Sequence, residues 1–252
     1  MPWRIVDLSD TIKNGTAEPL PHEIEYHSHE DGAAQAADMF GLKPSDFPEG
    51  KAWTVETLKL STHSGTHVDA PYHFGVESEG KPAKTIDEIP LEWCYGYGVV
   101  LDFSHRKAGD LITVEDIKAA LTKIPYQLKP GDIVLIRTDV WKKFGEPGYQ
   151  DLHPGMSEEA TLWLVEQGIK MMGIDAWGWD RPFNVMAHEF KKGVKDKLWA
   201  AHFAGKQKEY CHIEKLTNLD KLPPFGFKVA CFPVKIQGAS AGWSRVVAIF
   251  EE

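Results

Sequence analysis

Runs of apolar residues rich in β-branched side chains predict the buried strands of a sheet. Residues 98–103 and 132–137 are nearly continuous in apolar character, which is typical of strands covered on both faces. Residues 55–60 instead alternate apolar and polar side chains, which predicts a strand with one buried face. Further strands are expected at residues 4–8, 171–175, 228–234 and 245–250.

Capping residues predict two helices between these strands. Thr113 precedes a segment with Asp116 at its third position, and apolar residues then recur at helical spacing. Ser157 precedes a second segment that begins with two glutamates and ends near Gly168. Strands and helices alternate with no repeat and no linker. The sequence therefore predicts one α/β domain over residues 1–252, with a mixed sheet and flanking helices.

A polar segment at residues 24–53 interrupts this alternation. Proline and glycine are dense at its end, and such breakers predict a long excursion over the surface, with a short helix at residues 33–40. Long excursions of this kind are often lids or partner-binding arms. We therefore expect an extended excursion or a dimer arm here.

Composition and charge exclude several classes of protein. The 252 residues are 42% hydrophobic and 26% charged, which excludes a disordered tail, a coiled coil and a collagen-like rod. The net charge of −9 without a basic run argues against nucleic acid and anionic membranes as partners. No apolar run has the length of a signal peptide or a membrane span. Cys94, Cys211 and Cys231 form no C-x-x-C pair, so we expect buried free thiols and a cytoplasmic protein.

Residues with metal-binding side chains are concentrated between Thr62 and His73. His63, His67, Asp69 and His73 fall within eleven residues. The glycine, threonine, valine and proline among them are poor helix formers, so we expect this segment at a strand end and in the loop that follows. Two imidazoles and a carboxylate that converge there suit a divalent Zn, Mn or Fe ion. The alternative is a set of loop histidines bonded to backbone groups.

The segment 63–73, HSGTHVDAPYH, resembles the H-x-G-T-H-x-D-x-P-x-H signature of the cyclase-like metal-dependent hydrolases. That family includes isatin hydrolases and bacterial kynurenine formamidases. The chain is also similar to the family at residues 5–9, 131–132, 173–175, His202 and 212–219. The resemblance implies the swivelling β/β/α (cyclase-like) fold, hydrolysis of a cyclic amide or an aryl formamide, and a homodimer or larger homo-oligomer.

The resemblance also implies the metal ligands. His63, His67 and Asp69 would bind a first ion. His202 and Glu214, which are twelve residues apart, would complete a second site that shares Asp69. The expected cofactor is a divalent metal, Mn or Zn, bound as one or two ions.

A divalent ion and a histidine together provide what amide hydrolysis requires. A bound ion lowers the pKa of coordinated water from about 16 towards about 7 and polarises the scissile carbonyl. The leaving nitrogen must then be protonated, which suits a histidine. The resemblance gives this general acid/base role to His73, which would take the water proton and return it to nitrogen.

Other candidate nucleophiles are weaker. Residues 238–242 match G-x-S-x-G, but that motif needs a following helix and then an acid and a histidine, whereas residues 243–250 predict a strand. We expect a tight turn at the pocket wall instead. Cys211 fits a packed thiol better than a nucleophile. His212 would lie near a ligand, line the pocket or be structural, and Asp175 would support a turn or orient a ligand.

Aromatic residues near the motif favour a flat aromatic substrate, although most of the nine tryptophans and twelve phenylalanines are expected in the core. Arg181, in a predicted loop after a strand, would bind a carboxylate product or form a surface salt bridge. The substrate-binding residues that we predict are Phe40, Trp53, Phe74, Trp177, His212, Gln237 and Ser240.

The sequence therefore predicts a metal-dependent amidohydrolase that acts on a small aromatic amide. Isatin, opened to isatinate, is the first choice, because the aromatic residues and the long segment 24–53 are more typical of the larger ring-opening members. N-formylkynurenine is the alternative substrate, and a lactone is the third. A non-catalytic metal-binding or metabolite-binding protein on the same fold stays open, although such a protein would not need His73.

Overall fold

The computed structural model of the protein describes residues 3–16, 19, 21–194 and 198–251. The chain forms two compact units, Met1–Thr11 with Thr62–Glu252, and Ile12–Ser61. The excursion predicted at residues 24–53 lies inside the second unit. A single domain over the whole chain, and an arm function of the excursion, stay predictions.

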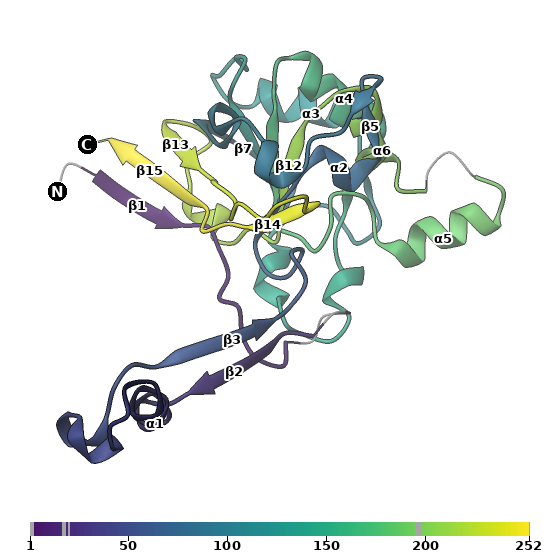
Figure 1. Ribbon diagram of the computed structural model, residues 1–252. Helices are drawn as coiled ribbons and strands as arrows, with labels where there is room; N and C mark the ends of the chain where they lie inside the picture. Colours follow the sequence, from purple (N-terminus) through teal and green to yellow (C-terminus); the bar gives the residue numbers. More distant parts are fainter. Residues whose placement is uncertain (1–2, 17–18, 20, 195–197, 252) are drawn as a thin grey trace. The chain divides into compact units, whose positions relative to one another are not determined.

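The larger unit is built on a mixed sheet with nine strands among the described residues (Figure 1). In spatial order the strands are β1 (Trp3–Asp7), β15 (Val247–Glu251), β13 (Phe227–Ala230), β7 (Tyr95–Asp102), β9 (Ile133–Arg137), β11 (Met171–Ile174), β12 (Cys211–Glu214), β4 (His67–Asp69) and β14 (Ala241–Trp243). From β7 to β12 neighbours are parallel, and the others pair antiparallel. The predicted α/β class is confirmed, but the strand expected at 228–234 already ends at Ala230.

Helices and short strand pairs complete this unit. The helices are α2 (Pro71–Phe74), α3 (Val114–Thr122), α4 (Glu158–Glu166), α5 (Phe183–Lys191) and α6 (Ala200–Gln207). The strand pairs are β5 (Glu77–Ser78) with β6 (Lys81–Pro82) and β8 (Leu111–Ile112) with β10 (Gly155–Met156). Both predicted helix starts are confirmed: the Thr113 hydroxyl accepts a hydrogen bond from Asp116 N at 3.3 Å. The Ser157 hydroxyl accepts one from Ala160 N at 3.0 Å.

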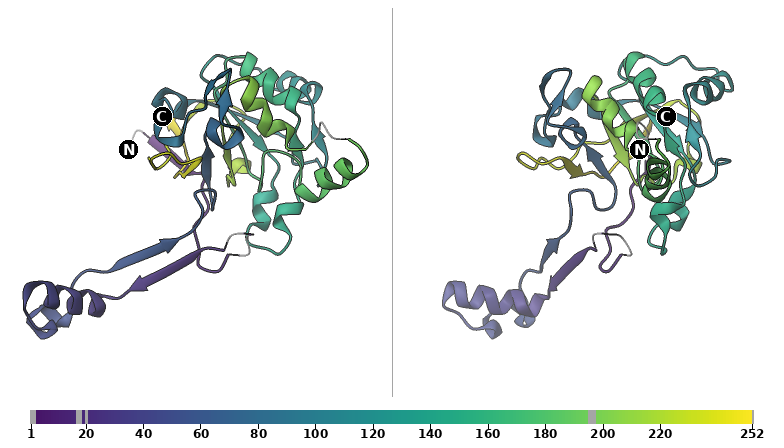
Figure 2. Two further views of the ribbon diagram at one scale, coloured as in Figure 1. Left: turned by 45° about the vertical axis from the view of Figure 1, so that its right-hand side comes forward. Right: turned by 90° about the vertical axis from the view of Figure 1, so that its right-hand side faces the viewer.

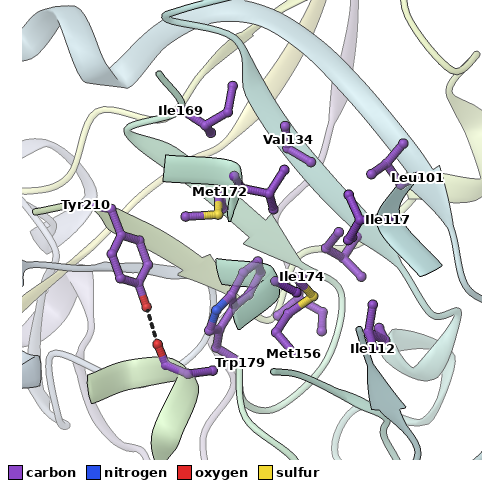
Figure 3. Close-up of a cluster of buried hydrophobic side chains, with 14 of the residues drawn as sticks. Leu101, Ile112, Ile117, Val134, Met156, Ile169, Met172, Ile174, Trp179 and Tyr210 are labelled. Carbon is purple, nitrogen blue, oxygen red and sulfur yellow. Dashed lines mark hydrogen bonds between the residues drawn. The ribbon is translucent and has the colours of Figure 1, made fainter. Parts of the chain in front are cut away.

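A hydrophobic core lies between one face of the sheet and helices α3, α4 and α6 (Figure 3). Its members include Val99, Leu101, Ile117, Val134, Ile136, Ala160, Leu164, Met172 and Ile174. The polar atoms of its aromatic residues are paired, as burial requires. Trp179 Nε1 donates to Thr161 Oγ1 at 3.0 Å, and the Tyr210 hydroxyl donates to Ala201 O at 2.9 Å. This layer of the larger unit is therefore well packed, with the polar atoms of these two aromatic residues paired.

The second unit contains a hairpin, an α-helix and the short 3-10 helices Pro44–Asp46 and Pro48–Gly50. β2 (Glu23–His27) pairs antiparallel with β3 (Val55–Lys59), and α1 (His29–Phe40) follows the His27 end of the hairpin (Figure 2). The predicted helix at 33–40 starts one turn earlier, because Ser28 and Asp31 form a capping box. The prediction of a half-buried strand at 55–60 is wrong. All five residues of β3 are exposed, since among the described residues this strand pairs with β2 alone.

Candidate metal centre and active site

Two neighbouring strands place four polar residues on one face of the sheet. β4 and β12 pair antiparallel, with His212 opposite Asp69 and Glu214 opposite His67. Residues two apart on a strand share a face, and opposite residues are in contact distance. The prediction that the motif lies at a strand end and in a loop is therefore wrong for His67 and Asp69, which lie on β4 itself. Val68 between them is fully buried, which makes this short segment a core strand.

The segments on either side of β4 place two more histidines. His63 lies in the preceding turn, where Gly65 has a φ of +58°, a conformation that favours glycine. His67 Nδ1 lies 2.8 Å from Gly65 O, so this nitrogen donates its proton and Nε2 keeps a free lone pair. His73 lies on α2, which begins with Pro71.

Helix α6 brings His202 to the same face of the sheet. Asp180 caps this helix: Oδ1 accepts from Ala201 N at 2.8 Å, and Oδ2 accepts from His202 N at 2.9 Å. Oδ2 also accepts from the imidazole Nδ1 of His202 at 2.5 Å, which leaves Nε2 for another partner. Residue 205 must be small where α6 meets α2, because a Cβ on Gly205 would lie 2.2 Å from the Phe74 ring.

Four side chains meet on this face of the sheet and are named here the buried group: Asp69, His202, His212 and Glu214. His212 Nε2 lies 3.1 Å from Asp69 Oδ2 and 3.3 Å from Glu214 Oε1. His202 Nε2 lies 3.9 Å from the same Asp69 oxygen and 3.6 Å from the same Glu214 oxygen. All four side chains are buried, and their donor atoms lie within 4.8 Å of one another.

The open group is defined here as His63, His67 and His73, which also lie close to the shared Asp69. His63 Nδ1 is 2.8 Å and His67 Nε2 is 3.2 Å from Asp69 Oδ1. His73 Nε2 is 3.9 Å from Asp69 Oδ2. The side chains of His63 and His73 are 26% and 24% exposed, whereas that of Asp69 is 1% exposed. A molecule from solvent therefore meets His63 and His73 first.

Charge and burial act in opposite directions on the pKa values at this site. Burial alone would raise the pKa of Asp69 and Glu214, yet the neighbouring histidines hold the pKa of Asp69 well below its usual range and that of Glu214 at about 2. Burial disfavours charge on His212, but the adjacent Asp69 and Glu214 carboxylates raise its pKa to about 9. Burial lowers the pKa of His73 to about 4, so this side chain is neutral at pH 7.

Both groups fit a divalent metal ion. Several buried atoms make no well-aligned hydrogen bond to a described residue, although ion-pair distances join some of them: His67 Nε2, both oxygens of Asp69 and both ring nitrogens of His212. Buried polar atoms without a partner are rare, and an ion between them would supply one. Imidazole nitrogens and carboxylate oxygens are suitable donors for zinc and manganese. All predicted metal ligands thus lie together, and His212 joins them.

The structure brings only some of the predicted substrate-binding residues to the open group. Ser240 lies there, with its Oγ 3.0 Å from His63 Nε2. Phe74 and His212 instead stack on each other inside the protein, with ring centroids 5.1 Å apart. Trp177 is half-buried and lies under the ammonium group of Lys215, 5.7 Å from its ring centroid.

Of the other three predicted substrate-binding residues, one belongs to the larger unit and two belong to the second unit. Gln237 is exposed in the turn before β14. Phe40 and Trp53 belong to the second unit, where their rings make an edge-to-face contact with centroids 6.5 Å apart. Their role in substrate binding stays a prediction.

The G-x-S-x-G segment forms a turn that leads into strand β14 and not into a helix, as expected. A histidine partner for Ser240 is nevertheless present, because His63 contacts Ser240 through Nε2 and Asp69 through Nδ1, at 3.0 and 2.8 Å. The argument from chain order against such a partner is therefore wrong. A Ser-His-Asp arrangement is defined by geometry and occurs with several chain orders.

The structure also shows what three further candidates from the sequence contact. Cys211 is fully buried, and burial raises the pKa of its thiol well above the usual value, as in an inert packed cysteine. Asp175 accepts hydrogen bonds from the backbone nitrogens of residues 138 and 139, at 2.6 and 2.9 Å, so it supports a turn. Arg181 donates to the Glu189 carboxylate at 2.8 Å.

Sequence reasoning missed two residues of the site. The Trp199 ring stacks on His202 with centroids 4.4 Å apart and meets His73 edge-on at 5.1 Å. Its φ of +56° is unusual for a bulky residue and is typical of functional sites. Asp180 was missed because nothing in its local sequence indicates that it caps a helix beginning at Ala200.

Comparison with known proteins identifies the family. The family described as Cyclase matches residues 6–181, so the chain belongs to this family. The kynurenine formamidase of Erythrobacter litoralis (strain HTCC2594) is 27% identical, over 97% of this chain and 93% of that protein. Isatin hydrolase A from Labrenzia aggregata is 27% identical, with a TM-score of 0.75 over 100% of this chain and 95% of that chain. Isatin hydrolase A from Ralstonia solanacearum is 26% identical, with a TM-score of 0.77 over 99% and 92%.

These likenesses confirm the predicted family, the cyclase fold and the enzyme class: the chain is a metal-dependent amidohydrolase. The names of these relatives refer to two different substrates, so the comparison does not decide between the predicted substrates. Within the described ranges, no helix has the length and apolar character needed to cross a membrane.

Proposed function

We propose that this protein opens isatin to isatinate by hydrolysis of its cyclic amide. The observation that carries the proposal is the open group: a neutral histidine, His73, lies beside an aromatic wall and next to the donors of a metal site. Water adds to the amide carbonyl carbon, the bond from carbon to ring nitrogen breaks, and the single product, isatinate, carries both a carboxylate and an aryl amine.

The residues at this site would have different roles in the reaction. A divalent ion bound by His63, His67 and Asp69 would polarise the carbonyl and lower the pKa of water. His73 accepts the proton of the attacking water at Nε2 and returns it to the leaving nitrogen. Its low pKa keeps the proton-accepting form populated at pH 7. Ser240, 3.0 Å from His63, is placed to donate a hydrogen bond to a substrate carbonyl.

One contact supports isatin over N-formylkynurenine. Trp199 offers a flat ring edge-on to His73, which suits a planar aromatic substrate. N-formylkynurenine carries an amino-acid carboxylate that needs a cationic partner. Arg181, which the sequence suggested for a carboxylate product, is paired with Glu189, and the Lys215 ammonium donates to His63 O at 3.0 Å, so these cations do not decide between the two substrates.

Parallel kinetics on the two substrates test the proposal. Wild-type protein loaded with Mn²⁺ or Zn²⁺ is assayed by absorbance with isatin and with N-formylkynurenine, and kcat/KM is compared. We expect isatin to be preferred and Trp199→Ala to raise KM for isatin. A preference for N-formylkynurenine would replace the proposed substrate with the alternative, and turnover of neither would leave lactones or a binding role.

A serine mechanism is the second candidate, since Ser240, His63 and Asp69 are in the required contact. The metal mechanism is favoured because Asp69 also faces His67, His202 and His212, which a serine triad does not need. Ser240→Ala separates the two mechanisms. A metal enzyme keeps measurable turnover with a raised KM, whereas a serine enzyme loses turnover and is insensitive to chelators.

We further propose that the protein works as a homodimer or larger homo-oligomer through the unit Ile12–Ser61. Large apolar side chains are exposed on this small unit: Tyr26, Met39, Phe40, Leu42, Val55 and Leu58. Such a concentration is typical of interaction surfaces. Deletion of residues 27–48 should reduce the mass measured by light scattering and raise KM; unchanged mass and KM would refute the arm.

A cytoplasmic location is proposed on the cysteines. Cys94, Cys211 and Cys231 are all buried and free. Free buried thiols are typical of a reducing compartment. Fractionation of cells that express the untagged protein tests this location, and recovery from a secreted or periplasmic fraction would contradict it.

A further inference from the structure

We propose that His212 is itself a metal ligand, and that the buried group forms a closed site with four protein donors. The second ion is then held by Asp69, His202, His212 and Glu214, while His63, His67 and Asp69 hold the ion that substrate reaches. This inference rests on the metal dependence of the proposed function, but not on the choice of substrate.

The spacing of the donor atoms carries the proposal. Zinc bonds to imidazole nitrogen and carboxylate oxygen are about 2.0–2.2 Å long, so a tetrahedral site has donor-to-donor edges of about 3.3–3.6 Å. Four edges of the buried group are 3.1, 3.3, 3.6 and 3.9 Å. These four edges therefore lie within a few tenths of an ångström of the tetrahedral values, and all the donor atoms of the buried group lie within 4.8 Å of one another.

His212 is held in position for this role. The strand register sets it opposite Asp69, and its ring is stacked between Trp179 and Phe74, with centroids at 5.3 and 5.1 Å. The side chain is 0% exposed, so it meets no substrate from solvent. Its Nε2 lies between two carboxylates and yet forms no hydrogen bond to a described residue. An ion at the centre of the buried group would give Nε2 a partner.

The supporting contacts point the other donors at the same centre. Asp180 accepts a hydrogen bond from Nδ1 of His202 and so leaves Nε2 for the ion. Trp179 N donates to Glu214 Oε1 at 2.8 Å, which fixes the carboxylate. The two oxygens of Asp69 divide between the sites, Oδ1 towards His63 and Oδ2 towards His212.

The two ions should therefore differ in accessibility. A site with four protein ligands has no open position and is typical of structural metal, whereas a catalytic site has three ligands and an open one. The buried ion should exchange slowly, and the open ion should exchange fast. Asp69 couples the two sites because both need its carboxylate.

Metal release tests the proposal without any substrate. Wild-type protein reloaded with Zn²⁺ is analysed for metal content by plasma mass spectrometry, and release to a coloured chelator is followed with time. We expect two ions per chain, one released fast and one slowly. His212→Phe keeps an aromatic ring in the stack but removes the nitrogen donors; we expect it to lose the slow phase, with affinity for that ion reduced by more than about 100-fold.

Tyr210→Phe is the matched control. Tyr210 stacks on Phe74 from the same cluster, with centroids 4.9 Å apart, but offers no donor to the buried group. This variant should keep both phases. If His212→Phe keeps the slow phase, or wild type binds a single ion at saturating Zn²⁺, the inference is refuted.

X-ray absorption on wild-type protein provides a test that does not depend on a variant folding. The slowly released ion should show four ligands, two of them imidazoles. A single imidazole would refute the role of His212. Failure of isatin turnover leaves these results unchanged, so the inference and the proposed substrate can fail separately.

Discussion

Replacement of Asp180 by asparagine should weaken metal binding and folding together. The carboxylate accepts three hydrogen bonds in the structure: one from Ala201 N at Oδ1, and two from His202, N and Nδ1, at Oδ2. An asparagine has one acceptor oxygen. If that oxygen keeps the two hydrogen bonds from His202, the amide nitrogen of the asparagine faces the N–H of Ala201. Two hydrogen-bond donors then oppose each other.

The magnitude follows from that count. One buried donor left without a partner costs about 1–3 kcal/mol of folding free energy. Loss of the carboxylate that orients a metal-binding histidine typically reduces metal affinity by about 10–100-fold. Asp180→Asn should therefore lower the free energy of unfolding by about 1–3 kcal/mol. It should also reduce the affinity for one of the bound ions by about 10–100-fold.

Urea unfolding of the metal-free protein and competitive metal titration measure the two effects separately. Asp116→Asn is the control, because Asp116 also accepts from a helix N-terminus, at Thr113 N, but lies on α3, away from the metal donors. The control should lose stability and keep metal affinity. If Asp180→Asn does the same, Asp180 is only a helix cap and the orienting role is refuted.

Three further changes have defined outcomes. His73→Ala should lower kcat by at least about 100-fold with unchanged metal content; loss of metal would instead make His73 a ligand. Gly205→Ala, whose Cβ would meet the Phe74 ring at 2.2 Å, should cost about 1–3 kcal/mol in urea unfolding; an unchanged midpoint would refute the close packing of α6. Burial raises the pKa of Asp175 to about 7. Between about pH 4 and 7 the folded state therefore binds one proton that the unfolded state does not. As pH rises through this range, the free energy of unfolding of wild type should fall by about 1.4 kcal/mol per pH unit relative to that of Asp175→Asn. A difference between the two proteins that is independent of pH would contradict this.

The sequence was informative wherever local chemistry decides the structure. Thr113 with Asp116, and Ser157, predicted helix starts because a capping residue acts within one turn. The residues of the 63–73 motif were found because they are contiguous. Their grouping with His202 and Glu214 came from the family resemblance, since these donors lie on α6 and β12.

What the sequence did not reveal depends on long-range geometry. His212 belongs with the metal donors because β12 pairs with β4 in one register, and a shift of one residue would turn it to the other face. Asp180 and Trp199 act across a loop and a helix terminus, which no local pattern predicts. β3 has an alternating pattern but pairs in a separate hairpin, so its apolar face stays exposed.

Hydrolysis of isatin before and after removal of metal tests the central claim most directly. The protein is stripped with a chelator, assayed, reloaded with Mn²⁺ or Zn²⁺, and assayed again, with metal content measured at each stage. We expect turnover to disappear with the metal and to return when metal is restored. Full isatin turnover by protein that contains no metal would contradict the claim that this site is a metal-dependent amidohydrolase.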